Sequence, residues 1–293
     1  MIDRPEVLRY AAFTRDPAAG NPAGVVLDAG ALDDAEMLAV AAEVGYSETA
    51  FLSADPAHEG RWSIRYFSPL AEVPFCGHAT IASGVALAER AGPGQVALDT
   101  QGGLVVVDTR YDEDGALEAT LTSVDPRVAP VDAADLEEAL AALRWERSEL
   151  DPGLPPGLAY AGAWHLVLAA ATRERLAHLD YDFTRLGDLM AARSWTTVHL
   201  VWREDASTFH VRDPFPPGGV VEDPATGAAA AAFGAYLRSL GEVRAPARVT
   251  LRQGEDLGRP SRLTVEVPES AGPLRVSGNA VVIPAQFIAG SSG

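Results

Sequence analysis

The most constraining feature of this sequence is a segment that occurs twice at a constant offset. Residues 72–84 read EVPFCGHATIASG, and residues 222–234 read EDPATGAAAAAFG. The copies share Glu, Pro, Gly and several Ala residues at matching positions, starting at 72 and at 222. Because the chain of 293 residues is about twice as long as that offset, the sequence predicts one fold used twice.

Each copy has the pattern of a turn that leads into a helix. Pro is tolerated in a first helical turn, Gly lets the backbone approach a ligand, and the Ala-rich run favours a helix. The pattern predicts helices over 79–90 and 229–240. Free N–H groups near Gly77 and Gly227 would suit an anion such as a carboxylate. The alternative is that the small residues only let helices pack closely against sheets.

The rest of the chain predicts short strands around these helices. Residues 61–67 alternate polar and apolar side chains, as a half-buried strand does. Short connections between such segments favour antiparallel pairing. We expect an α+β protein of two pseudo-symmetric domains, each a curved, mostly antiparallel sheet wrapped around a central helix. The expected domains are 1–125 and 126–275, with a final strand at about 276–289 returning to the first.

Composition excludes several functional classes. The formal charge of −18 argues against nucleic acid and anionic membrane surfaces as partners. The chain contains no Lys, which removes Schiff-base chemistry and the phosphate-loop lysine. Its single cysteine, Cys76, excludes an intrachain disulfide, a cysteine-based zinc cluster and a racemase that uses two cysteines. We predict no metal site. Because we find neither a membrane-spanning run nor a signal-peptide pattern, we expect a cytoplasmic protein.

Two residues in the first half are candidates for proton chemistry. Glu48 lies between Ser47 and Thr49 at a predicted strand entry, and apolar residues follow it. A carboxylate in apolar surroundings can both take and return a proton; the alternative is a local cap or ion pair. His78 follows Gly77 at a predicted helix start and could donate or accept a proton. The alternative is a structural histidine.

The second half offers Asp223, which precedes Pro224 at the matching place. Its alternative role is to cap the helix. Asn21 is interpreted as a turn former, with a ligand contact as the alternative. Residues 252–254 could bind an anion or order a loop. The remaining histidines show no ligand spacing and are predicted to be structural or on the surface: His58, His165, His178, His199 and His210.

Taken together, several segments resemble the PhzF-like family of phenazine biosynthesis, which shares its fold with diaminopimelate epimerase. The segments are 20–25 (GNPAGV), 47–51 (SETAF), 65–69 (RYFSP), 72–80 (EVPFCGHAT), 222–227 (EDPATG) and 252–254 (RQG). The resemblance implies a cofactor-independent isomerase, usually a homodimer, with its site between the two domains. It implies Glu48 as the acid/base, assisted by His78 and Asp223. The substrate-binding residues implied are Asn21, Ser47, Cys76, Gly77, Thr226, Gly227 and Ala228.

Two positions depart from related patterns. Cys76 aligns with one catalytic cysteine of the two-cysteine epimerases, but the other falls at Thr226, so that chemistry is not expected. Ala228 stands where the family commonly has Ser at the substrate site. The missing hydroxyl donor places the phenazine substrate itself in question.

The sequence therefore predicts an isomerase that moves a proton on a small carboxylated amino or hydroxy compound, similar to trans-2,3-dihydro-3-hydroxyanthranilate isomerase. One alternative is an epimerase or racemase of a small acid. The other is a catalytically inactive member that binds a small molecule.

Overall fold

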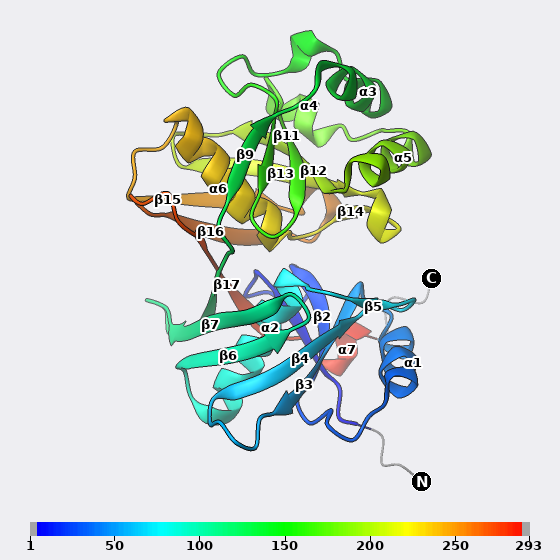
Figure 1. Cartoon of the computed structure of the whole chain (residues 1–293), viewed down its shortest axis with the longest axis vertical. Coiled ribbons are helices and arrows are strands. Elements are labelled where there is room, and N and C mark those ends of the chain that lie inside the picture. Colours follow the sequence, from blue (N-terminus) through cyan, green and yellow to red (C-terminus); the bar gives the residue numbers. More distant parts are fainter. Residues whose placement is uncertain (1–4, 289–293) are drawn as a thin grey trace. The chain divides into compact units, whose positions relative to one another are not determined.

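The computed structural model describes residues 5–288, and these residues form two compact units (Figure 1). Unit 1 contains residues 5–122 together with 277–288, so the end of the chain returns to it. Unit 2 contains residues 123–276. No helix among the described residues is both long and apolar enough to cross a membrane.

Unit 1 is a closed ring of strands around one helix. Its strands are β1 (Leu8–Ala12), β2 (Asn21–Val26), β3 (Glu48–Ala54), β4 (Arg61–Phe67), β5 (Glu72–Val73), β6 (Gln95–Thr100), β7 (Gly103–Tyr111), β8 (Leu117–Thr122) and β17 (Arg275–Val282). The ring runs β1-β2-β3-β4-β6-β7-β8-β17 and back to β1. The pairs β2–β3 and β4–β6 are parallel, whereas β1–β2, β3–β4, β6–β7 and β7–β8 are antiparallel.

Helix α2 (Gly77–Ala91) is the central helix of unit 1. Its residues from His78 to Ala88 are all buried. Gly84 permits this enclosure, because a Cβ there would lie 2.8 Å from Val107 Cγ1. A second helix, α1 (Asp34–Val44), crosses from β2 to β3; Asp33 and Glu36 form its capping box. A short helix, α7 (Ala285–Ile288), follows β17.

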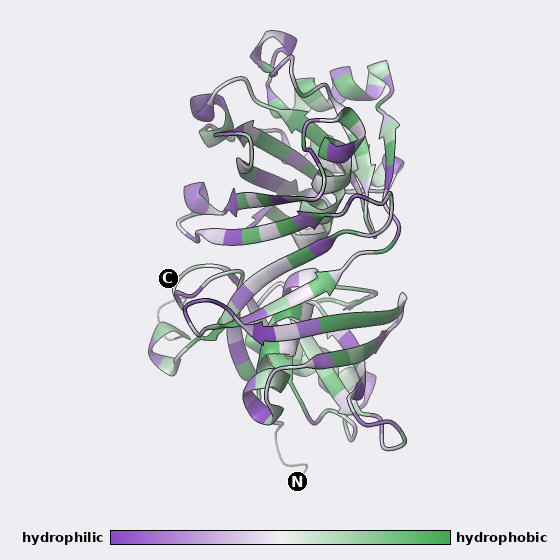
Figure 2. Cartoon of the chain, turned by 90° about the vertical axis from the view of Figure 1, so that its left-hand side faces the viewer, coloured by the Kyte–Doolittle hydropathy of each residue, from purple (hydrophilic) through white to green (hydrophobic). Residues whose placement is uncertain are grey.

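Unit 2 has a sheet in the order β9-β10-β11-β12-β13-β15-β16. The strands are β9 (Arg127–Pro130), β10 (Gly157–Tyr160), β11 (Trp164–Ala169), β12 (Trp195–Arg203), β13 (Thr208–Phe215), β15 (Ala247–Gln253) and β16 (Ser261–Val267), with β14 (Val220–Asp223) paired to β13. Helix α6 (Gly227–Leu240) is nearly all buried and packs on β10 and β16. Purple and green residues alternate along many strands in Figure 2, as expected for sheets with one buried face.

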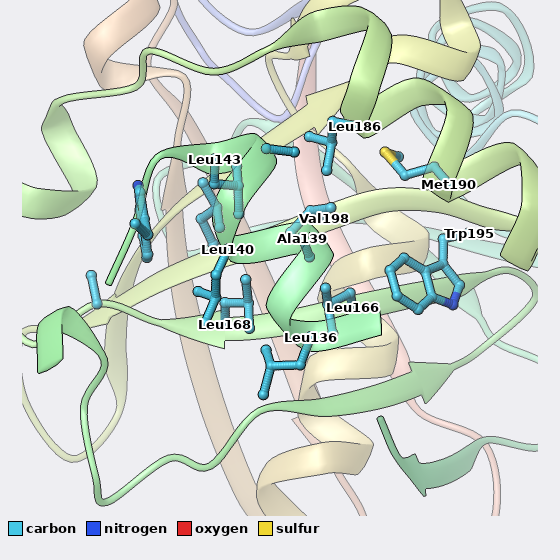
Figure 3. Close-up of a cluster of buried hydrophobic side chains, with 14 of the residues drawn as sticks. Leu136, Ala139, Leu140, Leu143, Leu166, Leu168, Leu186, Met190, Trp195 and Val198 are labelled. Carbon is cyan, nitrogen blue, oxygen red and sulfur yellow. The ribbon is translucent and has the colours of Figure 1, made fainter. Parts of the chain in front are cut away.

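The opposite face of this sheet is covered by further helices. These are α3 (Ala133–Leu143), α4 (Arg173–Ala177) and α5 (Phe183–Arg193). Leucines of α3 pack with Leu186 and Met190 of α5 against Leu166 and Leu168 of β11 (Figure 3). Unit 2 is therefore layered, with α6 on one face of the sheet and this apolar cluster on the other. Short 3-10 turns lie at Arg147–Glu149, Pro216–Gly218 and Glu255–Leu257.

The two units repeat one topology. The parallel pair β2–β3 matches β11–β12, and the antiparallel pair β3–β4 matches β12–β13. A short ribbon strand, β5 or β14, then leads into α2 or α6. The next strand, β6 or β15, pairs in parallel with β4 or β13. The predicted α+β class and its repeated sheet-and-helix architecture are confirmed.

Several local predictions differ from the structure. Asn21 was expected in a turn, but it is the first residue of β2. The short strands β5, β9 and β14 carry too few residues for alternation to reveal them. Residue 289 of the expected final strand lies outside the described residues.

Gly234 in α6 provides a test of this packing. A Cβ at Gly234 would lie 2.5 Å from Leu274 Cδ2 and 2.7 Å from Val265 Cγ1. We expect Gly234→Ala to lower the free energy of unfolding by about 1–3 kcal/mol through overpacking, despite the better helix propensity of Ala. Urea unfolding measures this change. Gly94→Ala is the control: no atom lies within 4 Å of its new Cβ, so a similar loss there would contradict the packing argument.

Candidate active site

Three of the predicted residues meet at the start of α2. Glu48 is the first residue of β3, Cys76 is the N-cap of α2, and His78 lies in its first turn. Glu48 Oε2 lies 3.4 Å from His78 Nε2 and 3.5 Å from Cys76 Sγ. The Glu48 side chain is only 15% exposed, so its carboxylate is largely enclosed yet still reachable. This gathering of an acid, a thiol and an imidazole is a candidate proton-transfer site.

Asn21 and Ser47 orient the imidazole. Asn21 Nδ2 lies 3.1 Å from His78 Nδ1, and Asn21 is buried. Because an amide N–H can only donate, Nδ1 accepts and the ring proton is on Nε2. Nε2 faces Ser47 Oγ at 3.4 Å as well as Glu48. Burial lowers the pKa of His78, and the nearby Glu48 carboxylate opposes this shift only in part. His78 is thus a neutral donor directed at the Glu48 carboxylate.

A metal ion does not fit this cluster as it is arranged. The donor atoms of Glu48, Cys76 and His78 all lie within 4.8 Å of one another. However, Cys76 Sγ is 3.4 Å from His78 Nδ1 and 3.7 Å from Nε2. With ordinary zinc–ligand distances, a metal shared by Cys76 and one ring nitrogen would leave the other nitrogen roughly 5 Å from the sulfur. Cys76 Sγ therefore lies over the face of the His78 ring. It does not lie along the direction in which either ring nitrogen would bind a metal.

The start of α6 is organised by a glutamine from β15. Gln253 is buried; its Nε2 donates to the Asp223 carbonyl at 2.8 Å and to Thr226 Oγ1 at 3.0 Å. Its Oε1 accepts from the Thr226 N–H at 3.0 Å. Thr226 in turn donates its hydroxyl to Asp223 Oδ2 at 2.6 Å. Residues 252–254 were predicted either to bind an anion or to order a loop. The hydrogen bonds of Gln253 support the second role.

The repeated glutamate of the two segments has a structural partner in each unit. Arg65 donates from Nε and Nη2 to the two oxygens of Glu72, both at 2.7 Å. Arg212 forms the same bidentate pair with Glu222, and both residues are buried. These Arg–Glu pairs tie β4 to β5 and β13 to β14, directly before each central helix begins. The shared glutamates are visible in the sequence, whereas their pairing with Arg65 and Arg212 is visible only in the structure.

The two helix starts are alike in backbone but not in side chains. Neither N-cap residue, Cys76 or Thr226, makes a side-chain capping bond. Gly77 and Gly227 are the first residues of α2 and α6, so Ala228 occupies the place that His78 has in α2. This position is therefore polar in α2 and apolar in α6. Ala228 therefore contributes no side-chain hydrogen-bond donor to the first turn of α6.

Unit 2 also contains buried polar residues that the sequence interpretation did not connect. His165, Thr197, His199 and Asp213 are all fully buried. Thr197 Oγ1 lies 2.8 Å from His165 Nδ1 and donates to Asp213 Oδ1 at 2.7 Å. His199 Nδ1 lies 3.0 Å from the same oxygen. The sequence does contain a signal for these buried polar residues: positions 197 and 199 are polar and alternate along an otherwise apolar strand.

Comparison with known proteins places the chain in a family. A family model described as phenazine biosynthesis-like protein, PhzC-PhzF, matches residues 10–285. The uncharacterized isomerase YfhB of Bacillus subtilis is 30% identical over 279 residues, covering 93% of this chain and 94% of the relative. The trans-2,3-dihydro-3-hydroxyanthranilate isomerase of Pseudomonas fluorescens is 29% identical over 276 residues, covering 92% and 94%.

Solved structures agree with this placement. A PhzF-family phenazine biosynthesis protein of Bacillus anthracis has a TM-score of 0.85 at 25% identity, covering 95% of this chain and 96% of that one. A probable proline racemase of Agrobacterium radiobacter, at 15% identity and a TM-score of 0.66, shares the fold over 94% and 90% of the two chains. Fold and relatives thus define an isomerase with an epimerase-like fold. The chain belongs to the phenazine biosynthesis-like, or PhzF, family.

The buried His165 predicts a pH dependence of stability. Burial lowers the pKa of His165 to about 3, whereas a histidine in an unfolded chain titrates near 6.5. Between these values the unfolded state binds the extra proton, so stability falls as the pH falls. The contribution approaches about 1.4 kcal/mol per pH unit. We expect His165→Gln to flatten the plot of unfolding free energy against pH between pH 6 and 4.

Chemical denaturation at a series of pH values measures this slope. Above pH 7 the wild-type and variant slopes should coincide, because the unfolded histidine is then also neutral. Equal slopes below pH 6 would show that His165 is not held neutral.

Proposed function

We propose that this isomerase moves a proton within a small carboxylated compound that bears an amino or hydroxy group. The observation that carries the proposal is the enclosed Glu48 carboxylate, which lies within 3.5 Å of both His78 and Cys76. The relative that is named for trans-2,3-dihydro-3-hydroxyanthranilate supports this substrate class. Glu48 would remove a proton from an activated carbon and return it at another position.

Other residues of the cluster support that role of Glu48. The neutral His78 directs its Nε2–H at the carboxylate and can donate to it or to a developing negative charge on the substrate. Asn21 holds the imidazole in this orientation. In unit 2 we assign Asp223 as the assisting acid/base. Its loop is held by Gln253 and Thr226, so the carboxylate has a defined position.

The substrate carboxylate is proposed to bind at helix N-termini. The first turns of α2 and α6 begin at Gly77 and Gly227, and their N-cap side chains leave the backbone N–H groups uncapped. Ala228 offers no hydroxyl to this region. The substrate is therefore expected to differ from that of the phenazine enzyme in the group that a serine would contact. The homodimer expected from the resemblance stays a prediction.

Glu48→Gln tests the proposal. The amide keeps the shape of the side chain but cannot accept a proton, so proton exchange should fall by about 100- to 10,000-fold. Both proteins are incubated in heavy water with a panel of cyclic and linear amino and hydroxy acids, including the dihydro-hydroxyanthranilate, and uptake of deuterium is read by mass spectrometry. The control is Glu59→Gln, at an exposed glutamate outside the cluster. Full turnover by a folded Glu48→Gln protein would remove Glu48 from the mechanism.

The same experiment distinguishes the epimerase alternative. The observation that favours it is the thiol of Cys76, 3.5 Å from Glu48 and beside the same imidazole. An isomerase introduces deuterium at a carbon that previously carried no exchangeable hydrogen, and the double bond moves. An epimerase introduces deuterium only at the inverted carbon. Chiral chromatography together with NMR of the labelled product identifies which carbon carries the deuterium.

A further inference from the structure

The carbonyl group of Cys76, the N-cap of α2, is held from inside the helix by Thr80. Thr80 Oγ1 donates to the Cys76 carbonyl oxygen at 2.6 Å, and the Thr80 N–H donates to the same oxygen at 3.0 Å. The Thr80 side chain is fully buried. The carbonyl oxygen of Cys76 therefore has two donors whose positions are fixed by the first turn of α2.

A buried tyrosine of β4 completes this arrangement. Tyr66 Oη lies 2.6 Å from Thr80 Oγ1, and Tyr66 is almost fully buried. Thr80 has one hydroxyl proton and gives it to a carbonyl, which can only accept, so Tyr66 donates its own proton to Thr80. Burial raises the pKa of Tyr66, which keeps the phenol in this donor form. We call Tyr66 and Thr80 the carbonyl clamp.

Tyr66 also contacts the residue that precedes Cys76. Its ring packs edge-to-face against Phe75, with ring centroids 5.9 Å apart and an interplanar angle of 73°. Tyr66 thus contacts the chain before Cys76 directly and reaches the Cys76 carbonyl through Thr80. Both contacts restrict the backbone at the point where β5 leads into α2.

The clamp fixes the direction of one backbone N–H group. The Cys76 carbonyl and the Gly77 N–H belong to one planar trans peptide, in which the two groups point in opposite directions. Because the carbonyl points into α2 toward Thr80, the Gly77 N–H points out of the helix start. Gly77 is partly exposed, so a ligand can reach it. On the other side of the same peptide, Cys76 Sγ lies 3.5 Å from Glu48 Oε2.

This arrangement differs from the usual side-chain cap. An N-cap Ser, Thr, Asp or Asn holds a helix start by accepting a hydrogen bond from a backbone N–H of the first turn, and that N–H is then no longer available to a ligand. The side chain of Cys76 makes no such bond. The clamp acts on the carbonyl instead, so it holds the helix start without occupying an N–H group.

Unit 2 lacks both residues of the clamp. Asp213 follows the arginine that holds the repeated glutamate of unit 2, as Tyr66 does in unit 1, so the two residues are equivalent. In α6, Ala230 has the place that Thr80 has in α2, and its N–H alone repeats the bond to the N-cap carbonyl. The start of α6 is held instead by Gln253, which bonds to the chain before the helix.

Unit 2 also lacks the candidate acid. Phe51 of β3 and Leu200 of β12 pair with the equivalent arginines of β4 and β13. Counting back three residues along each strand makes Glu48 equivalent to Thr197. The repeated fold thus forms in unit 2 without the clamp, and the clamp occurs in the unit that carries the candidate acid.

We propose that Tyr66 and Thr80 are positioning residues of the active site. They hold the Cys76–Gly77 peptide so that its N–H faces the substrate carboxylate and the Cys76 thiol stays beside Glu48. The inference rests on the carboxylate site proposed above at the start of α2. The clamp acts by position only, touches no substrate and transfers no proton.

Isosteric removal of the Thr80 hydroxyl tests the clamp. Thr80→Val keeps the shape of the side chain and removes its hydrogen bonds, whereas Thr80→Ser keeps the hydroxyl. The probe is acetate, the simplest carboxylate, and the assigned Gly77 amide signal is followed by NMR of the nitrogen-15-labelled protein as acetate is added. In Thr80→Val the half-saturating acetate concentration should rise about tenfold, the value of one hydrogen bond to a charged group. Thr80→Ser should restore binding to nearly the wild-type level.

Ser83→Ala is the matched control. Ser83 is also a buried residue of α2, and it donates its hydroxyl to the carbonyl four residues earlier, that of Ala79, at 2.7 Å. It lies about one turn further from the helix start, so its loss should leave acetate binding unchanged. Unchanged binding in Thr80→Val, or equal weakening in Thr80→Ser or Ser83→Ala, would overturn the proposal.

A double variant separates position from stability. Thr80→Val leaves the buried Tyr66 hydroxyl without its partner, which destabilises the protein whatever happens at the site. Tyr66→Phe combined with Thr80→Val removes both hydroxyls, and it replaces Thr80→Val if circular dichroism shows that the single variant does not fold. Its urea midpoint should recover toward the wild-type value while acetate binding stays weak. Recovery of both would show that the clamp acts through stability alone and would overturn the proposal.

Failure of the carboxylate site gives a different result from failure of the clamp. If the Gly77 signal of the wild-type protein does not respond to acetate, the carboxylate site at α2 is absent and the inference falls with it. If the signal responds equally in the wild type and in Thr80→Val, the carboxylate site stands and only the clamp is removed. Neither result depends on the Glu48→Gln experiment, which tests the proton transfer.

Discussion

The structure of each unit depends on enclosing one helix of small residues within a curved sheet. α2 and α6 are buried along nearly their whole length. Their Ala and Gly residues let strand side chains approach closely, as Val107 does at Gly84 and Val265 at Gly234. Where each helix begins is set by the ribbon before it, which the Arg65–Glu72 and Arg212–Glu222 pairs hold. The candidate catalytic residues lie at these helix starts or on the strands that adjoin them.

The backbone is repeated, but the polar chemistry is not. Unit 1 carries Glu48 where unit 2 carries Thr197, and His78 where unit 2 carries Ala228. Unit 2 instead places its carboxylates on β13 and β14, one of them opposite the other. Because the scaffolds match, these differences come from side chains alone. The two units thus have equivalent backbones that carry different polar side chains.

Much of the fold was accessible from sequence, and its gaps have physical causes. The predicted helices at 79–90 and 229–240 appear as Gly77–Ala91 and Gly227–Leu240, and the strand at 61–67 appears unchanged. The end of α3 at Leu143 is not evident from sequence, because Arg144 rather than a glycine takes the left-handed conformation there. Asn21 was interpreted as a turn former because Gly and Pro flank it. Its burial and its contact with His78 arise only once β2 and α2 pack together.

The sequence by itself determined the repeat, the burial of the central helices and the residue types at their starts, since these follow from local spacing and composition. Only the tertiary structure decided that Glu48 meets Cys76 and His78, and that Asp213 lies opposite Asp223. Those contacts depend on the register of paired strands and on the docking of a helix against them. Register is a long-range property, and a shift of one residue would turn every side chain to the other face.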